Sequence, residues 1–514
     1  AEELQPFYNY LDKVDPGHLF NKGKLRKETD LSIAFTPSFR LLSAETLLMQ
    51  RNELEDIASS IQNCLRCGKC KQVCSTHFPT ANLLYSPRNK IIATSLLIEA
   101  YLYEEQTRRG LSRRHLDALA DLSDHCTVCM KCLPPCPVKI NFGEVTIKLR
   151  NFLAANNYHR SNLPKRAGLG FLTLQSPASI KLARTVLVDY GFLAQRLAAD
   201  AVKVTTKPSL THPTPTTEYP STKRSYFLLA NRKLPRPRMH TTLRHLLNIT
   251  DPSVVPVIRN PALPEEALET VFYFPGCGND RLFPEIGLAC LALLWRAGVR
   301  TVLPPQFMCC GYPMVGNGMR ETAEKMVTQN KVQFHRMANT LNYLDIKTIL
   351  VSCGTCLKQL RDYHLEQIFP GSRLMDIHEY LARKGMNVNG ESNTRYLYHS
   401  PCHAPFSQNP KGIVGSLITP ADHSPIELTD RCCGESGTFA VGRPDIANQV
   451  RLSKELSLKA AKEKVESQGT SPFNGTVKVL TTCPGCFQGL SRYESRTRIQ
   501  AEFLAVELAR QAIG

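Results

Sequence analysis

The sequence predicts an α+β chain of several domains, in which a helical domain built around two cysteine-rich loops precedes a duplicated α/β domain that is also rich in cysteine. Two observations predict this organisation. A run of four cysteines between residues 64 and 74 recurs between residues 126 and 136, at a constant offset of 62 residues. Beyond residue 266, three further cysteine motifs each occur twice, at offsets of 125, 123 and 130 residues. Such spacing indicates an internal repeat.

The first cysteine run has the spacing C-x2-C-x2-C-x3-C, which is that of bacterial ferredoxins. The two runs consist of Cys64, Cys67, Cys70 and Cys74, and of Cys126, Cys129, Cys132 and Cys136. Three closely spaced thiolates can bind one iron-sulfur cube while the fourth binds the other, so we expect two [4Fe-4S] clusters. In this crossed arrangement Cys136 joins the first three cysteines of run one, and Cys74 joins those of run two. Zinc sites or disulfides are the alternatives.

Helical patterns flank both cysteine runs. Residues 44–62 carry apolar side chains near helical spacing and lead into the first run. Ser86-Pro87 predicts the start of a helix that extends to about Arg109, because serine caps helices and proline is favoured in the first turn. Ser112 is expected to cap a helix that ends before Cys126, and a further helix covers about 142–155. We therefore expect a helical dicluster ferredoxin-like domain over residues 31–160.

The second half of the chain alternates strands and helices. The apolar runs at 271–274 and 349–351 predict buried strands that lead into cysteines. Three motif pairs define the repeat: VFYFPGC with YLYHSPC, CCGYPMVGNG with CCGESGTFAVG, and ILVSCGTC with VLTTCPGC. We expect one α/β cysteine-rich (CCG) repeat over residues 267–385 and the other over residues 386–514.

Each repeat contains a single cysteine, an adjacent pair followed by glycine, and a C-x2-C motif. The five cysteines per repeat are Cys277, Cys309, Cys310, Cys353 and Cys356, and then Cys402, Cys432, Cys433, Cys483 and Cys486. Five thiols exceed what one zinc ion or one cubane binds. Neighbouring Cα atoms are about 3.8 Å apart, so both members of a pair reach one metal site only if the backbone turns sharply, which Gly311 and Gly434 permit. A thiolate that bridges two irons would use the fifth ligand, so we expect an iron-sulfur assembly that is not a simple cube.

Other polar or reactive residues near these motifs have a functional and a structural interpretation. Cys290 lies in the apolar run LACLALLW and is predicted to be a core residue. His403 follows Cys402, and Glu435 and Ser436 follow the second cysteine pair, where each could hydrogen-bond a cluster sulfur. For His403 we favour the structural role.

Residues 161–266 are expected to be helical at first and then to form a proline-rich basic linker. Ten prolines fall between residues 204 and 266. Seven lysines and arginines fall between residues 223 and 244, with no acidic residue from 223 to 245. A solvated basic loop is one interpretation. Docking to a partner domain or to anionic lipid is the other.

Composition narrows the choice of partner and compartment. The 514-residue chain carries a formal net charge of +18, so an anionic partner is one hypothesis. With one tryptophan and no RNA-binding signature, we expect no nucleic acid among the partners. We find no signal segment in the first thirty residues and no apolar run long enough to cross a bilayer. We therefore expect a reducing, cytoplasmic location, with any membrane contact peripheral and at the inner face of the cytoplasmic membrane.

The N-terminal segment resembles the closing motif of FAD-linked oxidases. Asp15-Pro16 is followed by Asn21, Gly23, Lys24 and Leu25, although Lys22 stands where that family usually has proline. The resemblance implies that residues 1–30 are the tail of a FAD-linked oxidase domain that precedes them. An ordinary loop with a turn at Pro16-Gly17 is the alternative.

From about residue 60 to the end, the motif order resembles the iron-sulfur subunits of glycolate oxidase, respiratory D-lactate dehydrogenase and anaerobic glycerol-3-phosphate dehydrogenase. The repeats are also similar to those of the heterodisulfide reductase catalytic subunit. In heterodisulfide reductases, five-cysteine sets of this kind bind noncubane [4Fe-4S] clusters. The resemblance therefore implies one or two further clusters in the repeats, besides the two cubanes.

These resemblances imply the iron-sulfur part of a FAD-dependent dehydrogenase of D-lactate, glycolate or D-2-hydroxyglutarate. A FAD-linked oxidase domain, fused upstream or separate, would oxidise the acid, and the clusters would pass electrons to a quinone or another acceptor. We can name no general base for that oxidation in this chain. A thiol-disulfide oxidoreductase of the heterodisulfide reductase type and a non-catalytic electron carrier are the alternatives.

Overall fold

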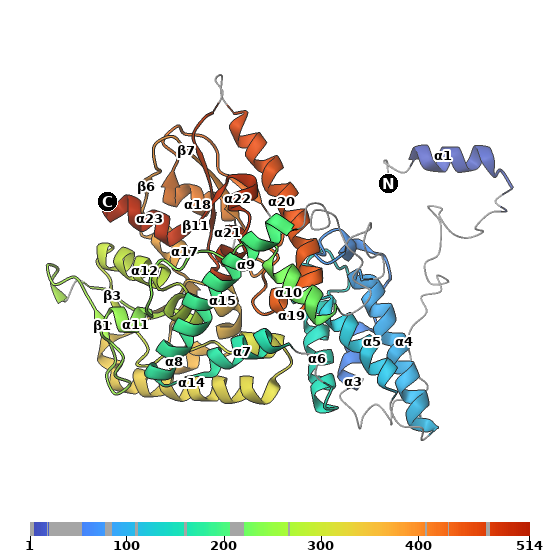
Figure 1. Cartoon of the computed structure of the whole chain (residues 1–514), viewed down its shortest axis with the longest axis horizontal. Coiled ribbons are helices and arrows are strands. Elements are labelled where there is room, and N and C mark those ends of the chain that lie inside the picture. The colour runs from blue at the N-terminus through green and yellow to red at the C-terminus, as the bar shows by residue number, and fades with distance from the viewer. Residues whose placement is uncertain are drawn as a thin grey trace.

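A computed structural model describes residues 5–17, 19, 54–77, 85–107, 112–158, 162–205, 220–265, 268–406, 409–429, 431–468 and 473–513. Figure 1 shows a helical domain, formed by the early part of the chain, beside two α/β units formed by the later part. Further helices between these parts extend across one side of the α/β units. The predicted order of a helical domain followed by a duplicated α/β domain is confirmed.

The helical domain encloses the two cysteine runs. Its described helices are α3 (Leu54–Ile61), η3 (Lys69–Lys71), α4 (Pro87–Gln106), α5 (Arg113–Asp124) and α6 (Phe142–Ala155). The predicted cap of α5 is present, because the Ser112 hydroxyl accepts a hydrogen bond from the backbone N–H of Arg114. Apolar side chains of these helices, such as Leu54, Phe142 and Leu149, pack into one core. This core holds the two cysteine loops at one end of the helices.

The connecting region folds onto the repeats. Its helices are α7 (Leu163–Thr173), α8 (Pro177–Arg184), the π-helical η4 (Thr185–Tyr190), α9 (Gly191–Thr205), α10 (Thr222–Ala230) and α11 (Leu243–Leu246). The interpretation of residues 223–244 as a solvated basic loop is wrong for two of its arginines. Arg232 and Arg244 are buried and pair with Glu455 and Asp280, each at 2.9 Å. A buried guanidinium requires a paired carboxylate, and here the repeats provide it.

Each repeat contains a sheet with the same strand order. The first sheet runs β1-β3-β2-β4-β5 and the second β11-β10-β7-β9, so β3, β2, β4 and β5 correspond to β9, β7, β10 and β11. The strands are β1 (Val257–Ile258), β2 (Thr270–Phe274), β3 (Arg300–Val302), β4 (Thr348–Val351), β5 (Arg373–Asp376), β7 (Thr394–His399), β9 (Glu427–Thr429), β10 (Thr476–Thr481) and β11 (Gln500–Phe503). Neighbours are parallel except β1 with β3. The predicted strands at 271–274 and 349–351 are confirmed as β2 and β4.

Helices cover both sheets. In the first repeat they are η6 (Gly278–Leu282), α12 (Pro284–Arg296), α13 (Tyr312–Gly316), α14 (Arg320–Thr340), η7 (Asn342–Leu344), α15 (Gly354–Arg361), α16 (Leu365–Ile368) and α17 (Ile377–Arg383). In the second they are α18 (Pro410–Leu417), α19 (Phe439–Gly442), α20 (Pro444–Glu466), α21 (Pro484–Ser491), α22 (Glu494–Thr497) and α23 (Leu504–Ile513). A small sheet pairs β6 (Val388–Asn389) with β8 (Ile418–Thr419).

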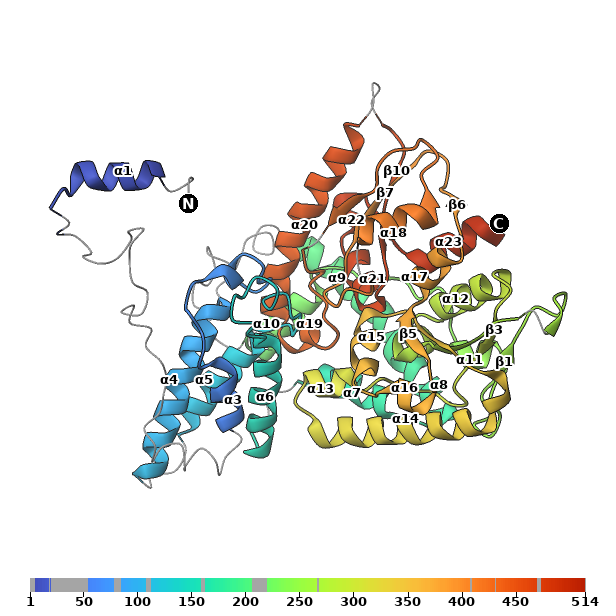
Figure 2. The ribbon, with the colours of Figure 1, turned by 180° about the vertical axis from the view of Figure 1, so that it is seen from behind.

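The two repeats pack through equivalent helices. Helix α12 of the first repeat packs on α23 of the second, and α18 of the second packs on α17 of the first (Figure 2). Because α12 corresponds to α18 and α17 to α23, the interface has an approximate two-fold symmetry. Apolar residues from both repeats form one continuous core, which includes Leu293, Leu381, Leu417 and Leu508. Cys290 of α12 lies fully buried in this core, as the sequence predicted.

The N-terminal helix lies apart from the rest of the chain. Helix α1 (Gln5–Val14) buries none of its described residues, and Phe7, Tyr10 and Val14 stay exposed. After it, the Asp15 side chain accepts a hydrogen bond from the Leu19 backbone N–H at 2.9 Å. The motif residues at positions 21–25 lie outside the described residues.

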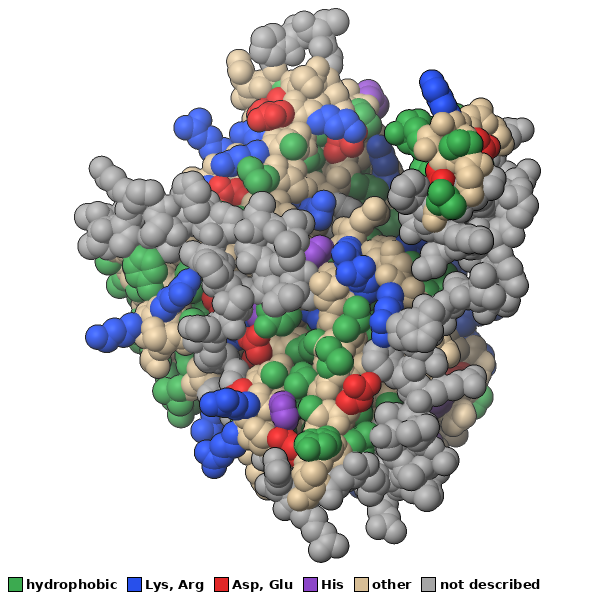
Figure 3. All heavy atoms as spheres, turned by 90° about the vertical axis from the view of Figure 1, so that its right-hand side faces the viewer, with side chains coloured by type: hydrophobic (Ala, Val, Ile, Leu, Met, Phe, Trp, Pro, Cys, Tyr) green, Lys and Arg blue, Asp and Glu red, His purple; other side chains and the backbone are tan. Residues whose placement is uncertain are grey.

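Two features of the described residues bear on membrane contact: the character of the helices, and the distribution of charge on the face of the helical domain. Among the described helices, none combines the length and the apolar character that crossing a bilayer requires. On the face shown in Figure 3, the described Lys and Arg side chains are scattered among acidic and apolar ones. The positive net charge is therefore not concentrated on that part of the surface.

A buried ion-pair network joins the helical domain to the second repeat. The Arg443 guanidinium donates to Asp121 of α5 at 2.9 Å and to Asp445 at 2.9 Å, and it lies 3.5 Å from Asp124. The Arg443 side chain is 3% exposed. Removing one partner of a buried ion pair is strongly destabilising, because the other partner then keeps an uncompensated charge in the interior.

Replacing Arg443 with Met should therefore destabilise the contact between the domains. We expect the free energy of unfolding to fall by about 3 to 5 kcal/mol, because Asp121 and Asp445 would keep buried, unpaired charges. Denaturant titration of the full chain measures the change. Arg320→Met is the matched control, since its ion pair with Glu324 is 65% exposed at the arginine. An equal loss of stability in the two variants would contradict the role of Arg443 in joining the helical domain to the second repeat.

Candidate metal centres

The two cysteine loops of the helical domain share one backbone conformation. Residues on both sides of the second cysteine are left-handed, with φ of 55° and 79° at Arg66 and Gly68, and 53° and 59° at Val128 and Met130. A β-branched residue such as Val128 is rarely found with positive φ. The Val128 carbonyl is held by contacts with the Tyr312 hydroxyl at 3.3 Å and with His403 Nε2 at 3.2 Å. The second loop is thus held in shape partly by side chains of the repeats.

The structure brings the ferredoxin-type cysteines together in the crossed groups. One cavity is lined by all four cysteines of the first group, Cys64, Cys67, Cys70 and Cys136, and also by Cys132. Burial, together with the neighbouring Cys126, Cys129 and Cys74, raises the pKa of the Cys132 thiol to about 12. Cys74 therefore lies with the second run and Cys136 with the first. Two cubanes bound in this way would be close neighbours.

Each repeat gathers its five cysteines at the carboxyl ends of its parallel strands. In the first repeat, the Cys309 and Cys277 sulfurs are 3.5 Å apart, and Cys356 contacts both Cys310 and Cys353. In the second, the Cys433 and Cys486 sulfurs are 3.6 Å apart, Cys402 contacts Cys432, and Cys483 contacts Cys486. This end of a parallel α/β sheet is where ligands bind most often.

Equivalent hydrogen bonds hold both sets of loops. The Tyr273 hydroxyl bonds the hydroxyl of Ser352 at 2.7 Å, and Tyr398 bonds Thr482 at 3.0 Å, just before each C-x2-C motif. Tyr363 donates to the Cys310 carbonyl at 3.1 Å, and Tyr493 donates to the Cys433 carbonyl at 2.7 Å. Each cysteine pair is followed by a left-handed glycine, with φ of 86° at Gly311 and 79° at Gly434. The predicted sharp turn is confirmed at both positions.

The two cysteine sets meet at the approximate two-fold axis. Cys353 and Cys483, which are equivalent residues, are in sulfur contact, and this contact is the main reason why the pKa of Cys483 is raised. On either side the loops pack without space for a side chain. A Cβ atom on Gly278 would lie 2.8 Å from Pro484, and one on Gly354 would lie 2.0 Å from the His403 carbonyl oxygen. These glycines allow the two sites to lie side by side.

A further sulfur contact links the helical domain to the second repeat. Cys129 contacts Cys402, and this contact lowers the pKa of the Cys129 thiol to about 6, while it raises that of Cys402. Arg150 supports the junction, because it donates to the carbonyls of Ser123 and Cys126 at 2.8 and 2.9 Å and also to the Gly316 carbonyl of the first repeat.

The residues around both five-cysteine sets fit an anionic iron-sulfur centre. Arg281 is buried beside Cys277 and Cys309, and its positive charge favours their thiolates. In the second repeat, Arg451 and Lys454 are fully buried. Among the described residues, Arg281 Nε and Arg451 Nε and Nη1 have no hydrogen-bond partner. Buried guanidinium groups with unused donors suit a site that carries negative charge.

The polar residues that the sequence singled out have different positions. The Ser436 hydroxyl lies 3.8 Å from the Cys432 sulfur, whereas Glu435 pairs with Arg451 and Arg492 and has no sulfur partner among the described contacts. His403 bridges the loops through Val128 and Tyr312, which supports its structural role. Burial, together with the nearby Lys358, lowers the pKa of His403 to about 4.

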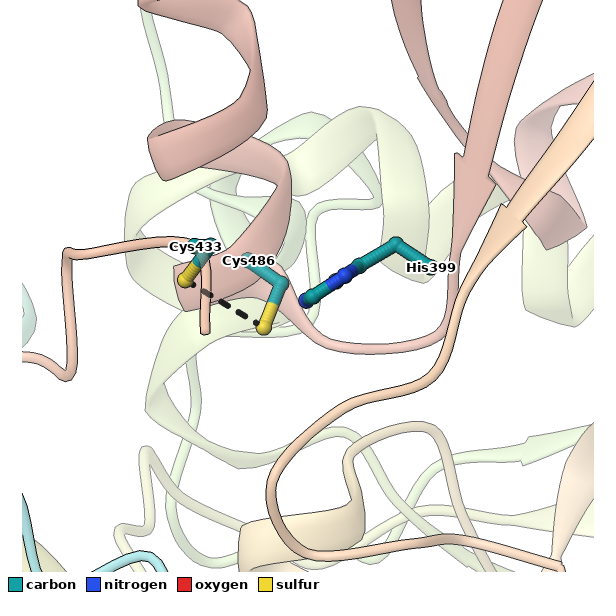
Figure 4. Close-up of side chains that lie close together, drawn as sticks. All are labelled: His399, Cys433 and Cys486. Carbon is teal, nitrogen blue, oxygen red and sulfur yellow. Dashed lines mark hydrogen bonds between the residues drawn. The ribbon is translucent and has the colours of Figure 1, made fainter. Parts of the chain in front are cut away.

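Sequence reasoning missed one candidate ligand, His399. It is buried at the end of β7, and a ring nitrogen lies within 4.8 Å of the Cys433 and Cys486 sulfurs (Figure 4). The repeat alignment contained the signal, because His399 aligns with Phe274 and is therefore an exception within the repeat.

Comparison with known families agrees with this architecture. The 4Fe-4S dicluster domain model matches residues 60–140, and the Cysteine-rich domain model matches residues 271–361 and 396–491. The chain thus contains a region similar to the 4Fe-4S dicluster domain, followed by a duplicated cysteine-rich domain. No solved structure matches it.

Several curated proteins are similar to this chain. The probable glycolate oxidase iron-sulfur subunit of Bacillus subtilis is 23% identical over 472 residues, 87% of this chain and 92% of that protein. A fumarate reductase (CoM/CoB) subunit of Methanothermobacter marburgensis is 29% identical over 42% of this chain and 40% of its own length. Lactate utilization protein A of an Exiguobacterium species is 26% identical over 36% of this chain and 78% of its own. The chain spans less than half the length of the first curated relatives that it matches.

Paired substitutions test the crossed ligand groups. Removing one ligand should release one cluster of about four irons, and a second substitution in the same group should release no more. We therefore expect Cys64→Ala/Cys136→Ala to lose about four irons and Cys64→Ala/Cys74→Ala to lose about eight, relative to the reconstituted wild type. Iron and labile sulfide analysis measures the loss, with Cys290→Ala as the control. The reverse pattern would show that each run binds its own cluster.

Proposed function

We propose that this chain is the iron-sulfur electron-transfer part of a FAD-dependent dehydrogenase of 2-hydroxy acids of the D-lactate, glycolate or D-2-hydroxyglutarate class. Electrons from the flavin would pass through the two cubanes to the centres of the repeats, and from there to a quinone or another acceptor. The iron-sulfur clusters supply the redox chemistry when they are bound. The protein positions them and adjusts their surroundings.

An unbroken series of sulfur groups carries this proposal. The first group of cysteines and Cys132 of the second group line one cavity. Cys129 of the second group contacts Cys402 of the second repeat, and Cys483 of that repeat contacts Cys353 of the first. Successive metal centres would therefore be neighbours over the whole path. A simple metal-storage or structural role would not need this continuity.

The exposure of the cysteines supports a direction for electron transfer through the chain. Cys67 of the first group is exposed, whereas Cys309, Cys310, Cys432 and Cys433 of the repeats are buried. The first cubane would thus be the one that an electron donor can approach from outside. The paired-cysteine centres would form the inner part of the path.

The N-terminal helix supports a flavin-domain partner. Phe7, Tyr10 and Val14 follow helical spacing and are 41%, 62% and 51% exposed. An apolar stripe of this kind, in a segment that resembles the end of a FAD-linked oxidase domain, suits packing on such a domain. The names of the relatives given above, a glycolate oxidase iron-sulfur subunit and a lactate utilization protein, support the same class of reaction.

Two cysteine variants test the relay in the protein together with its flavin partner. With Cys67→Ser or Cys129→Ser, we expect flavin reduction by the hydroxy acid to survive and reduction of a quinone analogue to fall at least tenfold. The reason is that the substitutions damage the clusters and leave the hydride step untouched. Stopped-flow measurement of flavin bleaching with D-lactate, glycolate and D-2-hydroxyglutarate gives the first rate, and dye reduction gives the second. Failure of all three acids to bleach the flavin would overturn the proposal.

A second candidate function is reduction of a disulfide, which the contact between Cys353 and Cys483 favours. Two adjacent metal centres could deliver one electron each, so that a disulfide takes up two electrons and two protons and leaves as two thiols. The Methanothermobacter marburgensis relative, named as part of a fumarate reductase (CoM/CoB), is similar to part of this chain. The same loops would then serve catalysis instead of relay.

Disulfide reduction is tested without any hydroxy acid. If it occurs, a one-electron donor such as reduced methyl viologen should drive thiol release from an added disulfide, and Cys433→Ser should abolish it. Cys67→Ser should only slow the reaction, because the donor can reach other centres. Thiol titration measures the product. Absence of thiol release in the fully reconstituted wild type would exclude this candidate.

A further inference from the structure

His399 makes the second five-cysteine site different from the first. The side chain is fully buried at the end of β7, three residues before Cys402, and Figure 4 shows it directed toward Cys433 and Cys486. The ring nitrogen and both sulfurs lie within 4.8 Å of one another. The ring therefore faces two of the candidate metal ligands.

The equivalent residue of the first repeat is Phe274. Phe274 and Cys356 lie together around Gly276, where an added Cβ atom would be 3.0 Å from the Cys356 sulfur and 3.5 Å from the Phe274 ring. The first site therefore has an apolar ring where the second has a nitrogen. The tyrosine hydrogen bonds and the glycine turns are alike in the two sites, so the replacement of Phe274 by His399 is a difference in polarity within a shared frame.

Lys454 determines which ring nitrogen of His399 carries the proton. The Lys454 ammonium lies 3.1 Å from His399 Nδ1 and 3.4 Å from the Thr429 carbonyl oxygen, which is itself 3.1 Å from Nδ1. An ammonium group has donors and no acceptor, so Nδ1 must accept from it and the proton resides on Nε2. The Thr429 carbonyl then accepts from Lys454 as well.

The Nε2–H group of His399 donates no hydrogen bond to any residue that the structure describes. Nε2 is buried and has no hydrogen-bond partner among the described residues. An unpaired buried donor costs free energy, so a partner is expected when the site is filled. The sulfur atoms of Cys433 and Cys486, which lie within 4.8 Å of a ring nitrogen of His399, or a cluster sulfide between them, would be the nearest candidate acceptors.

We propose that His399, held as the Nε2-protonated neutral ring by Lys454, donates a hydrogen bond to a sulfur of the metal centre in the second repeat and raises its reduction potential above that of the first. The proposal rests on the proposed iron-sulfur centre in that repeat. Hydrogen bonds to cluster or thiolate sulfur favour the reduced state, because that state carries more negative charge. His399 is thus a positioning and tuning residue.

This difference would give the two repeats separate roles. Among the described cysteines, the sulfur contact between the helical domain and the repeats is made by the second repeat, through Cys129 and Cys402. A higher potential there would draw electrons from the cubanes into the repeats. The first repeat, with Phe274, would then be the stronger reductant of the two.

The test uses the reconstituted full chain with three variants and one control. His399→Phe copies the first repeat, His399→Gln retains a side-chain N–H, and Lys454→Met removes the ammonium that orients the ring. His378→Phe is the control, because His378 is equally buried but bonds Asp376 and is not part of either cysteine set. Redox titration followed by electron paramagnetic resonance measures the potentials. Electron-nuclear double resonance in H2O and D2O detects an exchangeable proton near the centre.

We expect His399→Phe to lower the potential of one centre only and to remove its exchangeable-proton coupling. His399→Gln should restore part of both, and Lys454→Met should resemble His399→Phe because the proton moves to Nδ1. The control should leave both readouts unchanged. If the wild type holds iron in the second repeat and His399→Phe changes neither readout, the role of His399 is refuted while the metal centre stands. A nitrogen coupling of the size of a direct iron ligand would also refute it, and absence of iron from the second repeat would refute both proposals.

Discussion

The packing of α12 on α23, and of α17 on α18, determines how the two repeats face each other. These equivalent contacts bury one apolar core that belongs to both repeats, so neither sheet has a complete core alone. Because the cysteine loops follow the carboxyl ends of the parallel strands, the same packing directs both sets of thiols toward the approximate two-fold axis. The contact of Cys353 with Cys483, and the close approach of Gly278 to Pro484, follow from that arrangement.

Gathering so many thiols in the interior creates a problem of charge. Thiolates and the clusters that they bind are anionic, and an anion without compensation is costly in a medium of low dielectric constant. The chain places Arg281 beside the first set and Arg451 and Lys454 around the second. These buried cations would offset the negative charge of the thiolates and their clusters.

The repeats share a scaffold but differ where chemistry is adjusted. Tyrosine hydroxyls hold the loops in the same way in both, as Tyr363 and Tyr493 do for the carbonyls of Cys310 and Cys433. By contrast, the second repeat has His399 at the position of Phe274 in the first, and Glu435 at the position of Tyr312. Tyr312 and His403 hold the loop of Cys129, whereas Glu435 pairs with buried arginines. Duplication therefore supplied two similar frames, and single substitutions made their surroundings unequal.

The sequence by itself determined which residues are the candidate metal ligands and in what kind of loops they lie. Cysteine spacing is a local property, because three cysteines separated by two residues each lie on one short loop whatever surrounds them. The glycine after each cysteine pair likewise implied the sharp turn. Helix caps such as Ser112 and the strands before Cys277 and Cys353 were predictable for the same local reason. Tertiary structure alone decided that Cys129 meets Cys402, that Cys353 meets Cys483, and that Arg232 and Arg244 are buried. Those contacts join residues far apart in the chain, and they depend on how apolar helix faces pack, which no short motif records.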